Sequence, residues 1–166
     1  MDILQIIERM IWPGLAAVGF AILFNVPQRT LLLIFGMGAA CGVTKFMSME
    51  LGLEVVLATF LAAIVVGFLS IPAADNKHSP MYVFAIPSII SMIPGAFSYR
   101  AMLGLIKLTG HLSTEEYIQV MQETTSNGLK AVFVLLSIAV GVSMPMILLR
   151  HDSAQEIMAR IVKSRE

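Results

Sequence analysis

The sequence contains few charged residues and few side chains that bind metals. Only 13% of its 166 residues are Asp, Glu, Lys or Arg, whereas about a quarter are charged in soluble domains. Cys41 is its single cysteine, which excludes an internal disulfide and a cysteine metal cluster. With three histidines and a formal net charge of zero, we expect no metal site, no cofactor and no nucleic-acid partner.

The sequence also lacks the motifs of membrane-embedded enzymes. It contains neither H-E-x-x-H nor G-x-S-x-G, and no pair of Asp residues lies within an apolar segment. A catalytic function is therefore not predicted.

Long apolar runs dominate the chain, in which 57% of residues are hydrophobic. We predict an all-α integral membrane protein with about five membrane-spanning helices, the fourth of them broken at Pro94-Gly95, together with short amphipathic surface helices. The predicted spans are 3–24, 30–46, 53–71, 81–108 and 129–149. Residues 1–149 would form the transmembrane domain, and residues 150–166 a cytoplasmic amphipathic tail.

The segments between these spans carry turn and helix-start signals. Residues 45–54 and 72–80 are predicted to be a turn and a polar loop. Ser113 and Glu116 have the spacing of a capping box, which predicts a surface helix as far as residue 123. Asn127-Gly128 is expected to separate that helix from the last span.

The fourth span, with Pro87, Pro94 and then Arg100, is the most unusual part of the chain. A proline removes a helix hydrogen bond that hydrocarbon cannot replace, so we predict two shorter helices meeting near Pro94. Free N–H groups at the start of the second helix, with Arg100 one turn later, favour a carboxylate-binding site near the membrane centre. The predicted site consists of Pro94, Gly95, Ala96, Phe97, Tyr99 and Arg100. The alternative is a proline-kinked helix whose Arg100 extends to the membrane interface.

Two further features each allow two interpretations. Gly38 and Gly42 form a G-x-x-x-G motif, which serves either dimerisation or packing within the chain. Glu54, at the start of the third span, is either a proton carrier or partner of Arg100, or an acidic residue favoured at a helix amino terminus.

The distribution of positive charges favours a cytoplasmic carboxyl terminus and an external amino terminus. With the spans above, the carboxyl-terminal side of the membrane collects six basic residues and the other side five. These are Arg29, Lys77, Arg150, Arg160, Lys163 and Arg165 against Arg9, Lys45, Arg100, Lys107 and Lys130.

Three sequence elements resemble a known family, and the resemblance extends over nearly the whole of residues 3–145. They are Phe24-Asn25-Val26-Pro27, then Pro94-Gly95 followed by Tyr99-Arg100, and Asn127 ahead of Gly141-Val142-Ser143-Met144-Pro145. In these the chain is similar to the small membrane component of the threonine/serine exporter family, which includes two-component exporters of succinate and related dicarboxylates.

The resemblance implies half of an exporter in the bacterial inner membrane. The other half would be a larger five-span component with a cytoplasmic domain, and the cargo a small carboxylate. Asn127 and Glu54 are candidate acceptors for the ammonium group of an amino acid, and Glu54 is a candidate for proton coupling. A dicarboxylate would need a second cation, supplied by Lys130 or by the partner. A different alternative is a membrane scaffold that stabilises a transporting partner without transporting.

Overall fold

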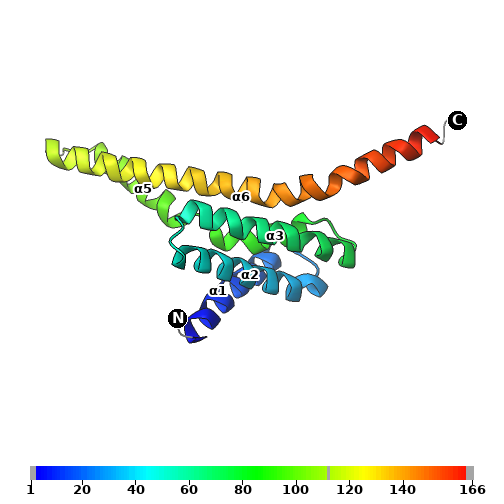
Figure 1. Ribbon diagram of the computed structural model, residues 1–166. Helices are drawn as coiled ribbons and strands as arrows, with labels where there is room; N and C mark the ends of the chain where they lie inside the picture. Colours follow the sequence, from blue (N-terminus) through cyan, green and yellow to red (C-terminus); the bar gives the residue numbers. More distant parts are fainter. Residues whose placement is uncertain (1–2, 112, 164–166) are drawn as a thin grey trace.

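The computed structural model describes residues 3–111 and 113–163, and over these residues the chain consists of helices joined by short turns (Figure 1). Side chains are described for residues 5, 7–111 and 113–148. The six α-helices are α1 (Ile3–Leu23), α2 (Leu31–Glu50), α3 (Val55–Lys77), α4 (Tyr82–Ile89), α5 (Gly95–Leu108) and α6 (Thr114–Lys163). Short 3-10 helices precede α2 (η1, Gln28–Thr30) and follow α4 (η2, Ile90–Met92). The predicted all-α class is confirmed.

Helices α1 to α4 and the middle of α6 form a bundle. Helix α2 packs between α1 and α3, α4 contacts all three, and α6 lies along α3 (Figure 1). Small residues bring the helix axes close together. A Cβ added at Gly38 would lie only 2.6 Å from the Cβ of Ala17, and one at Gly42 only 2.5 Å from the Cγ of Pro13. The G-x-x-x-G motif therefore serves packing within the chain, between α2 and α1.

Three segments are long and apolar enough to cross a membrane, namely Gln28–Glu50, Val55–Lys77 and Thr114–Leu148. The pair Tyr82–Met92 and Gly95–Leu108, bent by 53°, would be a fourth if it forms one broken span. The structure thus supports three or four of the five predicted spans. The span predicted at 3–24 is helical as α1 and remains a prediction as a membrane crossing.

Several predicted boundaries are wrong because helices continue through them. Helix α2 includes Lys45 and ends only at Glu50. Helix α3 runs through Pro72 to Lys77, where His78 in the left-handed conformation ends it. The buried side chains of Ala73 and Ala74 pack into the core, and this packing offsets the hydrogen bond lost at the proline.

The predicted break at Asn127-Gly128 is also wrong, because α6 is one helix of 50 residues. The predicted surface helix is its first part. At 1.5 Å per residue α6 is roughly 75 Å long, more than twice the thickness of a hydrocarbon core. Its backbone is helical as far as Lys163, so no separate helix begins at residue 150. The amphipathic character predicted for residues 150–166 concerns side chains outside the described part of the chain.

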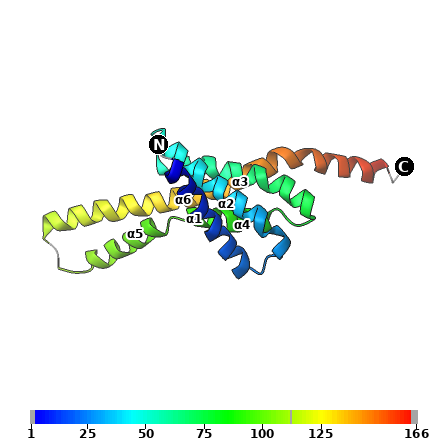
Figure 2. The same ribbon diagram turned by 90° about the horizontal axis from the view of Figure 1, so that it is seen from below.

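Helix α5 and the first half of α6 form an antiparallel hairpin that projects from the bundle (Figure 2). The predicted capping box starts α6: the Ser113 N–H donates to Glu116 Oε2 at 3.1 Å, and the Glu116 N–H donates to Ser113 Oγ at 3.4 Å. The main packing partner of α5 is α6. The hairpin is consequently the part of the structure that the other helices of this chain cover least.

Candidate functional site

The break between η2 and α5 provides two of the three backbone donors that the sequence predicts. Pro94 is the residue before α5, and the helix begins at Gly95. The Gly95 N–H already donates to the carbonyl of Ile93 at 2.8 Å. The N–H groups of Ala96 and Phe97 belong to the first helical turn, where no acceptor exists within the helix.

The side chains around this break point in different directions. Gly95 and Ala96 are exposed, and Tyr99 is 65% exposed. Phe97 instead turns toward α6, where its ring centroid lies 6.0 Å from Nζ of Lys130. In the part of the chain that the structure describes, the predicted residues 94–99 therefore do not face one common space.

A small polar pocket lies one turn further along, between α5 and α6. Its volume is about 140 Å³. It is lined by Arg100, Leu103, Gly104 and Lys107 of α5 and by Val120, Glu123, Thr124 and Asn127 of α6. Arg100 and Asn127, which are 27 positions apart in the sequence, thus line the same pocket.

Helical periodicity and one glycine create this pocket. Arg100, Gly104 and Lys107 follow each other at spacings of four and three residues, so they share one face of α5. A Cβ added at Gly104 would lie 2.9 Å from the Cβ of Thr124. The missing side chain therefore lets the two helices approach closely enough for their polar groups to line one space.

The hydrogen bonds on the α6 side arrange the polar groups of the pocket. Nδ2 of Asn127 donates to the carbonyl of Glu123 at 2.8 Å. The hydroxyl of Thr124 donates to the carbonyl of Val120 at 2.6 Å. Both bonds are internal to α6, so the Asn127 Oδ1 and the Glu123 carboxylate keep their acceptor capacity.

Lys107 and Glu123 are pocket residues that the sequence analysis did not select. Each lies on the same helical face as a selected residue: Lys107 is seven positions after Arg100, and Glu123 four before Asn127. That spacing was the available signal, and the predicted helix break at Asn127 obscured it.

Glu54 lies elsewhere, as the residue that precedes α3. It is exposed, and its carbonyl accepts the N–H of Ala58 at 2.9 Å. This is the helix amino-terminal position that one of its two interpretations foresaw, and it does not line the α5–α6 pocket.

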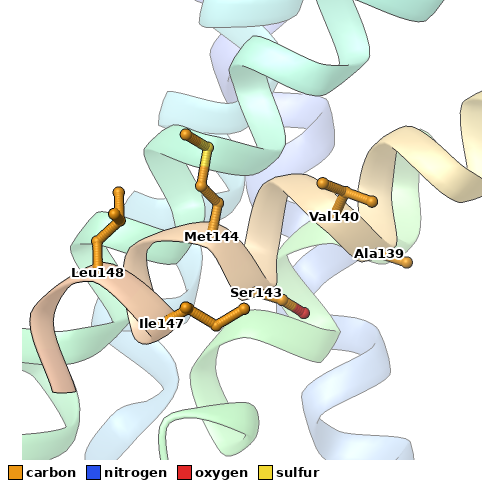
Figure 3. Close-up of a pocket in the computed structure, with 6 residues that line it drawn as sticks. All are labelled: Ala139, Val140, Ser143, Met144, Ile147 and Leu148. Carbon is orange, nitrogen blue, oxygen red and sulfur yellow. The ribbon is translucent and has the colours of Figure 1, made fainter. Parts of the chain in front are cut away.

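A larger hollow of about 380 Å³ lies along α6. All six lining residues come from this one helix, and Ser143 provides the single polar side chain among them (Figure 3). An apolar hollow on a membrane-crossing helix suits lipid chains, so it is not the candidate site.

The comparisons with known proteins agree with the resemblance seen in the sequence. The family model described as "Threonine/Serine exporter, ThrE" matches residues 9–148. A protein of Haemophilus influenzae named "Uncharacterized protein" is 29% identical over 142 residues, which cover 86% of this chain and 47% of that protein. The chain thus spans about half the length of this curated relative.

No solved structure matches the chain. The family match includes the break at Pro94 and every residue that lines the α5–α6 pocket. It extends over most of the described helices, from within α1 as far as residue 148 of α6. The chain belongs to the threonine/serine exporter family of membrane transporters.

Proposed function

We propose that this chain is the small membrane subunit of a secondary transporter that exports threonine or serine by alternating access. The observation that carries the proposal is the α5–α6 pocket, which is lined by Arg100 and Lys107 of α5 and by Glu123 and Asn127 of α6. Ionisable residues in membrane proteins commonly line substrate pathways, and this pocket offers both signs of charge.

Both charges of an amino acid find a counterpart in this pocket. A guanidinium binds a carboxylate through two parallel hydrogen bonds, which assigns the substrate carboxylate to Arg100. Glu123 is the acceptor for the ammonium group, and Oδ1 of Asn127 accepts from the same group or from the side-chain hydroxyl. The volume of about 140 Å³ suits a small metabolite, since pockets for drug-sized ligands measure roughly 300–1,000 Å³.

The presence of Glu123 favours an amino acid over a dicarboxylate in this pocket. Lys107 is a possible second cation for a dianion, but the Glu123 carboxylate would repel the second negative charge. Pro94 and Gly95 set the helix break, while the N–H groups of Ala96 and Phe97 and the hydroxyl of Tyr99 would take part in binding when a second subunit covers them.

A larger partner is proposed because the pocket belongs to a projecting hairpin. Helix α5 packs mainly against α6, so this chain alone does not enclose the substrate. The relative from Haemophilus influenzae has about as much additional sequence beyond the matched part, which supports a second unit. We propose an inner-membrane complex with a cytoplasmic carboxyl terminus, driven by the proton gradient, with Glu54 as a candidate proton carrier.

Efflux measurements test this function. Cells expressing this chain with its larger partner are loaded with labelled threonine, serine or succinate, and efflux is compared with that from cells expressing either component alone. Arg100→Ala and Glu123→Gln are expected to abolish amino-acid efflux. Arg29→Ala and Glu115→Gln, which remove charges outside the pocket, are the matched controls.

The scaffold alternative predicts a different result. If Arg100→Ala lowers only the abundance of the partner, and efflux per complex stays unchanged, the chain is a scaffold. If succinate leaves the cells while threonine and serine do not, the proposed substrate class is wrong.

A further inference from the structure

A second polar pocket lies where α1, α2 and η2 meet. Its volume is about 220 Å³. The lining residues are Arg9 and Pro13 of α1, Gly42, Lys45, Phe46 and Met49 of α2, and Ser91 and Met92 of η2. Two cations and a hydroxyl from three separate helices thus line one small space.

Among the residues whose side chains the structure describes, the charges in this pocket are all of one sign. Arg9 and Lys45 both line it, whereas no described Asp or Glu does, including Glu8 next to Arg9 and Glu50 at the end of α2. Lys45 is half-buried and lies within the candidate membrane span Gln28–Glu50. Two cations sharing a space of reduced dielectric repel each other, and an anion between them converts this repulsion into attraction.

The walls of the pocket orient Arg9 and fix the distance between α1 and α2. The guanidinium carbon of Arg9 lies 4.5 Å from the centroid of the Phe46 ring, a cation–π contact that orients the charged group. A Cβ added at Gly42 would lie 2.7 Å from the carbonyl oxygen of Arg9. This close approach of α1 and α2 sets the separation of the helices that carry Arg9 and Lys45.

We infer that Arg9, Lys45 and Ser91 form a binding site for an anionic oxygen group, a carboxylate or a phosphate. Arg9 and Lys45 donate charge-assisted hydrogen bonds to it, and the Ser91 hydroxyl donates a third. A dissolved small dicarboxylate and the headgroup of an anionic lipid both present such a group. The site does not depend on the proposed export of amino acids, because it uses other residues on other helices.

Succinate binding to the purified chain tests the site without any transport. The chain is placed in nanodiscs of zwitterionic phosphatidylcholine, and Trp12, its single tryptophan, reports binding because it lies one helical turn after Arg9. We expect saturable binding of succinate and none of succinamide, which is neutral and of similar size. Arg9→Gln and Lys45→Gln should each weaken binding about tenfold or more, and Ser91→Ala less.

Two control variants distinguish binding in this pocket from binding to positive charges elsewhere in the chain. Lys107→Gln removes a cation of the α5–α6 pocket and Arg29→Gln one outside both pockets, and neither should change succinate binding. In a second set of nanodiscs containing phosphatidylglycerol, native mass spectrometry counts the lipids that stay bound. Lipid retention that is lost in Arg9→Gln and Lys45→Gln identifies the headgroup as the anion.

The inference is overturned if neither succinate nor phosphatidylglycerol binds, or if Arg9→Gln and Lys45→Gln bind both as well as the unmodified chain. Each variant is first checked by size-exclusion chromatography. If Arg9→Gln does not fold, Lys45→Gln and Ser91→Ala decide the outcome. Binding is measured on the purified chain and threonine efflux is measured in cells, so failure of this site and failure of the proposed export are distinguishable.

Discussion

An engineered disulfide between α5 and α6 gives the sharpest test of the hairpin that forms the candidate site. A Cβ added at Gly128 would lie 3.9 Å from the Cβ of Ala101, and disulfides join Cβ atoms about 3.5–4.5 Å apart. We therefore expect the pair Ala101→Cys and Gly128→Cys to oxidise readily. Cys41→Ala in the same chain removes the single native thiol.

The expected stabilisation follows from the loop that this disulfide closes. Residues 101–128 make a loop of about 28 residues, for which chain-entropy loss gives at most about 3.5 kcal/mol. The gain should be smaller here, because helices in a membrane stay formed when their mutual contacts are lost. The yield of the disulfide is therefore a better measure of the geometry than the stability it adds.

Protection from a maleimide-linked polyethylene glycol measures this yield. After mild oxidation, the double-cysteine chain should take up no label until it is reduced. The matched control is Met102→Cys with Gly128→Cys, because Met102 is 65% exposed and lies about 100° further around α5 than Ala101. If both pairs remain equally open to labelling, α6 does not continue through Asn127-Gly128 beside α5, and the pocket geometry is refuted.

Three further substitutions test the packing on which the site depends. Gly104→Ala should destabilise the folded chain by about 1–3 kcal/mol, because its Cβ would meet Thr124. Gly95→Ala should not destabilise it, because its Cβ would meet nothing within 4 Å. Equal thermal unfolding midpoints of the two variants in detergent would contradict this expectation. Ser113→Ala removes the two hydrogen bonds that its hydroxyl makes with Glu116 and should speed amide hydrogen exchange in the first turn of α6, and an unchanged rate would show that the cap does not hold this turn. Gly141→Val should prevent close packing of α6 on α3, since its Cβ would lie 2.7 Å from an alanine Cβ of α3, and a normal yield of folded protein would contradict that contact.

Local chemistry made some features of the fold predictable. The capping box at Ser113 and Glu116 depends on a spacing of three residues, and both of its backbone bonds are present. The change of direction after Met92 follows from the chemistry of Pro94, and the two helices there are bent by 53°. Such features are decided by neighbours in the sequence, which is why they can be read from it.

The helix ends were less predictable because packing overrides weak local signals. Gly128 costs about 1 kcal/mol in a helix relative to alanine, too little to break one that is held by tertiary contacts. The Asn127 side chain bonds within the helix, to the carbonyl of Glu123, instead of capping a new one. For the same reason the sequence identified Arg100 and Asn127 but not the other charged residues of the candidate pocket. Lys107 and Glu123 line the pocket because α5 pairs with α6.

The two polar pockets differ in charge, so each is suited to a different class of ligand. The α5–α6 pocket contains Arg100 together with Glu123 and is therefore suited to a zwitterion. Among the described side chains, the charged groups in the pocket of Arg9 and Lys45 are both positive, which suits a group with more than one negative oxygen. If the complex exports amino acids, Glu123→Gln should stop efflux and Lys45→Gln should not. If it exports dicarboxylates, the order is reversed, because Glu123→Gln then removes a repulsion while Lys45→Gln removes an attraction.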